Sequence, residues 1–252
     1  MEETLRPEVA YFNDTSVSYR KEYDRVTPEG YSFRVRREKV LDMVPPKTRV
    51  VDIACGPGVM IRGLRSKNCD ITCTDAAPEM IARIKEEHGE EKDLTAVVGD
   101  AYQLPFDGAS YDVALAMGLI EYLEDEDRFL SEVQRILKNN GIFIITFPNY
   151  SSPWRAFNRI ALWVRGLFRK RSSGKTGVRH REYSARRASA LLTQHGFTTL
   201  ETRYYNFKLV PYPLDRMLPR FTVAQSGAFE RLDRSALRWL GTGFIIKARK
   251  YN

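Results

Sequence analysis

Two glycines and two acids in the first half of the chain have the spacing of a nucleoside-binding site. Gly56 and Gly58 lie in the small-residue turn CGPG, where a backbone without side chains can come close to a ligand. Asp75 follows Gly56 by about 20 residues, the distance expected for an acid that accepts hydrogen bonds from ribose hydroxyls. It stands shortly before Pro78, which can begin a helix, so N-capping is its other role. Asp100 ends a later apolar run in the same way.

Four short apolar segments in this part of the chain are typical of buried strands, and the first three lead into the glycine turn or end at one of the acids. They span residues 50–53, 71–74, 94–100 and 111–117 and are rich in β-branched and aliphatic side chains. In an open α/β sheet the carboxyl ends of the parallel strands meet at one edge, and ligands bind there. The spacing therefore predicts that the glycine turn and the acids share one site.

A dinucleotide-binding dehydrogenase is the first alternative. Its fingerprint G-x-G-x-x-G would take Gly56 and Gly58 as its first two glycines and needs a third at position 61. Ile61 occupies that position, and Pro57 lies inside the motif. Because a side chain at position 61 keeps helix and strand apart, the sequence argues against hydride transfer.

Together, these residues resemble the class I S-adenosylmethionine-dependent methyltransferases, especially the ubiquinone and menaquinone biosynthesis branch. The resemblance covers about residues 11–148 and returns at 180–197 and 241–250. The first motif of that family commonly reads V-L-D-x-G-x-G-x-G, and here it is VVDIACGPG. Ala54 replaces the first glycine of the motif, and its backbone would be strained if the turn requires a positive φ there.

The resemblance implies an α/β fold with a Rossmann-like, doubly wound, seven-stranded sheet whose last strand is antiparallel. Cap helices at the N-terminus and insertions in the C-terminal part complete it. We expect a single methyltransferase domain over residues 1–252, which the chain's length and hydrophobic content also favour. Its expected parts are an N-terminal cap at 1–46, a cofactor-binding core at 47–150, an insertion at 151–182, and the rest of the sheet at 183–252 with a second insertion at 208–240.

The cofactor that the resemblance implies is S-adenosyl-L-methionine, with no metal. In this family Asp52 would hold the turn, Asp75 would bind the ribose, Met80 and Asp100 would contact the adenine, and Met117 would lie under the methionyl part. The complete set of implied cofactor-binding residues is Asp52, Ala54, Gly56, Gly58, Asp75, Ala76, Met80, Asp100, Ala101 and Met117.

Methyl transfer from a sulfonium requires few catalytic groups from the protein. The sulfonium is already a good leaving group, so the enzyme mainly aligns the acceptor and excludes water. A base is needed only if the acceptor must lose a proton early. His180 and Glu121 are the two candidates, each with an ordinary structural role as its alternative. Tyr19 and Tyr23 are candidates to line the methyl channel or simply to pack in helices.

Basic residues are concentrated in the C-terminal part. Residues 1–150 contain 19 Lys and Arg against 27 Asp and Glu, whereas residues 151–252 contain 21 against 5. The segment 153–171 predicts an amphipathic helix with tryptophans and other apolar residues on one half and arginines on the other. Such a helix favours contact with an anionic membrane surface, with a lid over the active site or a solvated basic face as alternatives.

The second insertion, 208–240, is rich in proline and large apolar residues. Its final part, 229–241, predicts another basic amphipathic helix. Exposed apolar surface rimmed by arginine suits an amphiphilic substrate with an anionic head, and a homodimer interface is the alternative.

The predicted function is methyl transfer from S-adenosylmethionine to an O, N or C atom of a small, amphiphilic or lipid-like substrate. A soluble natural-product tailoring methyltransferase is the alternative. A nucleic-acid partner is disfavoured, because MGLIEY at 117–122 replaces the N/D-P-P-Y/F motif of the amino-methylating branch. Three cysteines without a disulfide pattern, and neither a leader nor an apolar run of about 18 residues, predict a cytoplasmic protein, or a peripheral one at the inner face of a membrane.

Overall fold

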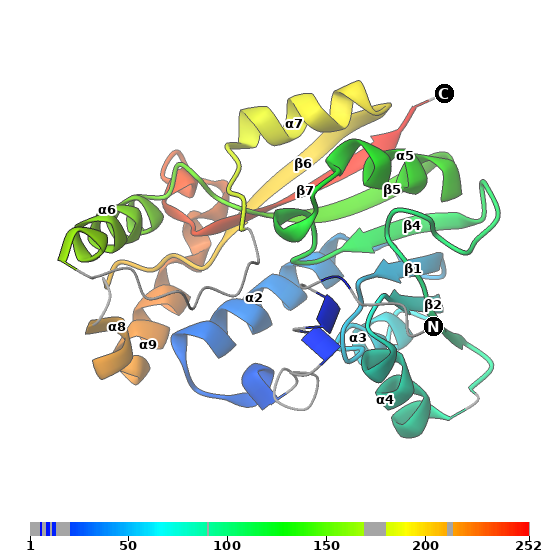
Figure 1. The fold of residues 1–252 in the computed structure, drawn as a ribbon, viewed down its shortest axis with the longest axis horizontal. Helices are drawn as coiled ribbons and strands as arrows, with labels where there is room; N and C mark the ends of the chain where they lie inside the picture. The colour runs from blue at the N-terminus through cyan, green and yellow to red at the C-terminus, as the bar shows by residue number, and fades with distance from the viewer. Residues whose placement is uncertain are drawn as a thin grey trace.

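Seven strands form one sheet in the order β3-β2-β1-β4-β5-β7-β6 (Figure 1). The computed structural model describes residues 6, 9–10, 12–13, 21–89, 91–168, 180–210 and 214–251. β7 pairs antiparallel with both neighbours, and the other pairs are parallel. This confirms the predicted fold class. The strands are β1 Arg49–Ile53, β2 Asp70–Asp75, β3 Leu94–Val98, β4 Tyr111–Ala116, β5 Leu137–Pro148, β6 Phe197–Tyr205 and β7 Gly243–Lys250.

Helices cover both faces of the sheet (Figure 1). One face packs against α2 (Pro28–Met43), α3 (Ile61–Arg65) and α4 (Pro78–His88), and the other against α5 (Glu126–Ile136) and α7 (Ala185–Gln194). Side chains alternate along a strand, so Val50 of β1 enters the first core while Val51 and Ile53 enter the second. Burial on both faces explains why β1 is an almost continuous apolar run.

Two insertions lie beside this framework. The first is α6 (Pro153–Phe168), which follows β5. The second joins β6 to β7 and contains α8 (Leu214–Met217), α9 (Pro219–Phe229) and the 3₁₀ turns η2 (Glu230–Arg234) and η3 (Arg238–Leu240). In Figure 1, α6, α8 and α9 lie at the same end of the molecule.

The predicted helix over 229–241 is wrong. The α-helix ends at Phe229, and the chain continues in two short 3₁₀ turns. Ser235 interrupts the helical pattern, because its Oγ donates to the Leu232 carbonyl at 2.9 Å and accepts from the Leu237 amide at 3.1 Å. Such local side-chain bonds compete with the backbone bonds of a helix.

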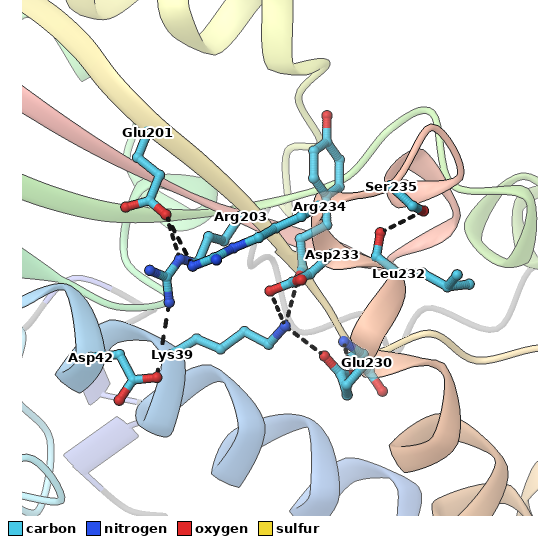
Figure 2. Close-up of polar contacts among 11 residues, drawn as sticks. Lys39, Asp42, Glu201, Arg203, Glu230, Leu232, Asp233, Arg234 and Ser235 are labelled. Atoms are coloured by element: carbon cyan, nitrogen blue, oxygen red, sulfur yellow. Dashed lines mark hydrogen bonds and ion pairs between the residues drawn. The ribbon is translucent and has the colours of Figure 1, made fainter.

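A buried lysine on α2 attaches the second insertion to the N-terminal part of the chain. Figure 2 shows Lys39 between Glu230 and Asp233, with its Nζ 3.0 Å and 2.8 Å from their carboxylate oxygens. Its Nζ also donates to the Tyr204 carbonyl at 3.0 Å. Only 12% of the Lys39 side chain is exposed. Because α2 also contributes to the site below, this lysine helps to fix two walls of that site relative to each other.

Candidate active site

The glycine turn after β1 has the left-handed backbone that the motif predicts. Gly56 has φ +53° and Gly58 has φ +72°. Ala54 has φ +55°, so the alanine that replaces a glycine does occupy a strained conformation, at a cost of about 1 kcal/mol. Strain of this kind is characteristic of functional turns, where the surrounding structure enforces it.

Asp75, at the end of β2, connects the glycine turn to the start of α4. Its Oδ2 accepts from the Gly56 amide at 2.8 Å, and its Oδ1 accepts from the Ala77 amide at 2.9 Å. Burial raises the pKa of Asp75, and these backbone N–H groups oppose the rise. The acid thus stabilises both the turn and the helix start, and each carboxylate oxygen has a further lone pair for a ligand.

A pocket opens at the carboxyl ends of β1, β2 and β4, and we call it the cofactor pocket. Met80, Met117 and the glycine turn all contribute to its lining. The predicted cofactor-binding residues that line it are Ala54, Gly56, Asp75, Ala76, Met80, Ala101 and Met117.

Gly58 and Asp100 do not line this pocket. A Cβ on Gly58 would lie 2.5 Å from Ile61 Cδ1 and 3.1 Å from Ile84 Cγ1, so this glycine permits close packing of α3 and α4 instead. Asp100 accepts from Arg6 Nη2 at 2.8 Å and from the Tyr102 amide at 3.0 Å. Arg6 therefore binds the carboxylate of Asp100, which the resemblance implies would contact the adenine.

Asp52 lies beneath the turn rather than in the pocket. It is 1% exposed, and neither carboxylate oxygen has a hydrogen-bond partner among the described residues. Burial and the nearby charge of Asp75 raise its pKa to about 7. Asp52 was expected to hold the turn, but among the described residues its oxygens accept no hydrogen bond from it, and the Gly56 amide donates to Asp75 instead.

The N-terminal segment, predicted as a cap, contributes residues to the cofactor pocket that sequence reasoning did not name. Arg6, Val9 and Phe12 line it although they lie far from the strand ends in the chain. Tyr23 lines it as well and stacks on Phe33 with ring centroids 5.1 Å apart. Tyr19, the other channel candidate, lies outside the described residues.

A second pocket, which we call the acceptor pocket, adjoins the first. Both pockets are lined by Phe12, Gly118 and Tyr122. The two predicted base candidates, Glu121 and His180, come together in the acceptor pocket although 59 positions separate them in the chain. They come from η1 (Ile120–Tyr122), just after β4, and from the chain before α7.

Burial and cations set the protonation of these two groups. Glu121 is 6% exposed, and its Oε2 has no hydrogen-bond partner among the described residues. Burial raises the pKa of Glu121, while the charges of Arg36 and Arg155 oppose the rise. Partial desolvation and Arg155 lower the pKa of His180. The rise makes Glu121 a stronger base, whereas the lowered pKa favours the neutral form of His180, which can accept a proton but is a weaker base.

α6 borders the acceptor pocket through Trp154 and Arg155. Trp154 lines the pocket and donates from Nε1 to the Val210 carbonyl at 2.9 Å, so it does not belong to an outward apolar face as predicted. Arg155 donates to Glu182 at 3.0 Å, and Arg159 pairs with the same carboxylate. The arginine side of the helix therefore faces the protein, and Phe157 on another side is exposed.

The sheet order and the site at its carboxyl edge have the architecture of the class I S-adenosylmethionine-dependent methyltransferases, whose cofactor is S-adenosylmethionine. Residues 51–145 match the family model described as a methyltransferase domain. The predicted class and cofactor are confirmed. Among the described residues, no helix is both long and apolar enough to cross a bilayer.

Known relatives agree with this assignment. The chain is 32% identical over 139 residues to the chloroplastic 2-methyl-6-phytyl-1,4-hydroquinone methyltransferase of Arabidopsis thaliana. The matched region covers 52% of this chain and 40% of the relative. The chain thus spans about two fifths of the curated relatives that it matches first.

Two solved structures show the same fold over nearly the whole chain. One is from the complex between the Haloferax volcanii Trm112 methyltransferase activator and a methyltransferase (TM-score 0.65, 19% identity, 96% of this chain and 98% of that chain). The other is the 1,6-didemethyltoxoflavin-N1-methyltransferase of Burkholderia thailandensis with 1,6-didemethyltoxoflavin and S-adenosylhomocysteine bound (TM-score 0.62, 16% identity, 98% and 88%).

Proposed function

We propose that this protein transfers the methyl group of S-adenosylmethionine to a small, amphiphilic, hydroxyl-bearing acceptor seated in the acceptor pocket. The observation that carries the proposal is that the two pockets share Phe12, Gly118 and Tyr122. A methyl donor in the first pocket would thus face an acceptor in the second. The hydroquinone named for the Arabidopsis relative is a small, hydroxyl-bearing ring compound, which supports this acceptor class.

The cofactor pocket fits S-adenosylmethionine. The free lone pairs of Asp75 suit ribose hydroxyls, and Met80 and Ala101 provide an apolar wall for adenine. The backbone at Gly56 allows the methionyl part to approach closely. When bound, the cofactor supplies a methyl group on a sulfonium.

The acceptor pocket offers proton removal next to positive charge. Glu121 can take the proton of an acceptor hydroxyl. The charges of Arg36 and Arg155, which lower the pKa of Glu121, can stabilise the oxygen anion that remains on the acceptor. His180 at the same pocket is the other proton acceptor. Incubation with methyl-labelled S-adenosylmethionine and 2-methyl-6-phytyl-1,4-hydroquinone tests the proposal, and a wild type that binds the cofactor but labels neither this compound nor other small hydroxyl-bearing acceptors would overturn it.

Asp75→Ala is expected to weaken S-adenosylmethionine binding by roughly 1.5 to 3 kcal/mol, the range for hydrogen bonds to a charged group. The variant removes the ribose acceptor and also releases the Gly56 amide from its partner. Isothermal titration calorimetry measures the loss. Asp70→Ala, at the exposed start of the same strand, is the matched control and should keep wild-type affinity. Unchanged affinity in a folded Asp75→Ala protein would remove Asp75 from the site.

We also propose that this protein is peripheral at the inner face of a membrane. The end of the molecule formed by α6, α8 and α9 would bind the anionic membrane surface. Three large apolar residues of α6 are exposed to solvent: Phe157 (47%), Ile160 (63%) and Trp163 (67%). α8 and α9 of the second insertion lie at the same end of the molecule as α6 (Figure 1). The second insertion also carries exposed apolar residues: Leu209, Leu214, Met217, Leu218 and Phe221. The bond from Trp154 to Val210 joins the two insertions.

Charge supports this partner. The exposed arginines of the second insertion are Arg220, Arg231, Arg234 and Arg238, and residues 151–252 carry a large excess of basic residues. Apolar side chains rimmed by arginine can enter the boundary of a bilayer while the cations meet its head groups. An amphiphilic acceptor could then reach the acceptor pocket past Trp154 and Lys208, which line it.

The double variant Phe157→Glu, Trp163→Glu is expected to lose at least about tenfold in affinity for vesicles of phosphatidylcholine and phosphatidylglycerol, because the apolar contact is lost and the new charges repel the anionic lipid. Sedimentation measures binding, which should also fall with added salt. Val26→Glu, at another exposed apolar position, is the control. A wild type that ignores these vesicles would favour the soluble tailoring enzyme, and a dimer that the double variant disrupts would favour a homodimer interface.

A further inference from the structure

Aromatic side chains line the junction of the two pockets. Among the described residues, Phe12, Gly118 and Tyr122 are the ones that line both the cofactor pocket and the acceptor pocket. Gly118 has no side chain, so the side chains that the two pockets share are those of Phe12 and Tyr122. A group that passes from one pocket to the other must therefore move beside these two rings.

The two rings come from distant parts of the chain and contact each other. Phe12 belongs to the N-terminal segment, and Tyr122 belongs to η1 after β4. Their ring centroids are 5.4 Å apart with an interplanar angle of 77°, so they pack edge to face. Tyr122 packs in the same way against His180 in the acceptor pocket, at 5.5 Å and 82°. The folded chain thus holds both junction rings in place.

The charges around the junction leave these rings as the attractive surface for a cation. Asp75 is the one acid among the described residues that line the cofactor pocket, and it binds the Gly56 amide. Arg36 lies beside the junction, because a Cβ on Gly118 would be 2.8 Å from Arg36 Nη1. Its positive charge acts on Glu121 in the acceptor pocket. Aromatic faces attract cations through the ring quadrupole, most strongly where water is excluded.

We propose that Phe12 and Tyr122 stabilise the sulfonium cation of S-adenosylmethionine by cation–π attraction and so favour the methyl donor over the uncharged product, S-adenosylhomocysteine. Both are then specificity-determining residues for the donor. The sulfonium must lie at the junction, because its methyl group has to reach an acceptor in the second pocket. This inference rests on the proposed function, which assigns the acceptor pocket to the methyl acceptor.

Variants at these positions separate the ring from the volume it fills. Tyr122→Phe keeps the aromatic face and removes the hydroxyl, whereas Tyr122→Leu keeps an apolar side chain without a ring. Phe12→Leu makes the same change at the other ring. Trp154→Leu is the matched control, because Trp154 lines the acceptor pocket and not the cofactor pocket.

Calorimetry on the full chain tests the proposal with S-adenosylmethionine, S-adenosylhomocysteine and sinefungin, which carries an ammonium group in place of the methylated sulfonium. The informative quantity is the affinity for each charged ligand divided by the affinity for S-adenosylhomocysteine. Tyr122→Leu and Phe12→Leu should each lower this ratio about fivefold for both charged ligands, the effect of losing a cation–π contact in a desolvated site. Tyr122→Phe and Trp154→Leu should retain the wild-type ratio.

An unchanged ratio in Tyr122→Leu or in Phe12→Leu would overturn the inference. An equal loss of affinity for all three ligands would also overturn it, because that result is expected of rings that only pack. A lowered ratio for S-adenosylmethionine but not for sinefungin would indicate recognition of methyl shape rather than charge, and would contradict the inference too. Failure of the proposed function is a separate result, in which the ligands bind with the expected ratios but no small acceptor is labelled.

Discussion

Replacing Glu121 with glutamine is expected to lower kcat for methylation of 2-methyl-6-phytyl-1,4-hydroquinone by about 100-fold or more, the size of a general-base contribution. Glutamine has nearly the same shape but cannot take a proton from the acceptor. The glutamine side chain still lines the acceptor pocket, so KM should change much less than kcat. Steady-state kinetics with labelled methyl donor measure both constants.

The pH profile separates Glu121 from His180. Glu121 acts as a base only when ionised, and because burial raises its pKa, the wild-type rate should rise with pH above the range of an ordinary glutamate. His180 has a lowered pKa, so its own limb would lie below that of an ordinary histidine. The glutamine variant should lose the limb of Glu121. A full rate in Glu121→Gln, with loss in His180→Gln, would transfer the role to the histidine.

Lys39→Met is expected to lower the free energy of unfolding by about 3 kcal/mol, because it leaves Glu230 and Asp233 largely buried without their cation. Methionine retains most of the aliphatic volume, so lost packing contributes little. Urea denaturation followed by circular dichroism measures the change. Lys85→Met, on the exposed side of α4, is the control and should cost less than about 0.5 kcal/mol.

The loss in Lys39→Met should depend on pH in a defined direction. Burial already raises the pKa of Glu230, and Lys39 holds it down, so removing the lysine raises it further. A carboxyl whose folded pKa is raised destabilises the folded state as pH increases through the ordinary glutamate range. The deficit should therefore be largest at neutral pH and shrink when the carboxyls are protonated in acid. A deficit that does not vary with pH would indicate lost packing rather than lost charge pairing.

The sequence by itself determined the features that depend on neighbouring residues. The apolar runs with their turn and helix-start signals predicted the strands of the sheet, because buried parallel strands need both faces apolar. The carboxyl ends of such strands share one edge, which brings Gly56, Asp75 and Met80 into one pocket. The strained Ala54 was also predictable, since the motif position itself requires a left-handed backbone.

Only the tertiary structure decided which distant residues complete the site. Arg6 binds Asp100 across 94 positions, and Lys39 reaches Asp233 across 194, and no local pattern encodes such pairs. The 3.6-residue period of α6 predicts two unlike faces but not which one meets the protein, and this depends on the position of Glu182. The conformation of Asn206 gives no signal in the sequence either, because it depends on contacts to Glu230 and Thr242 that form only when the chain segments after β6, at η2 and before β7 are packed together.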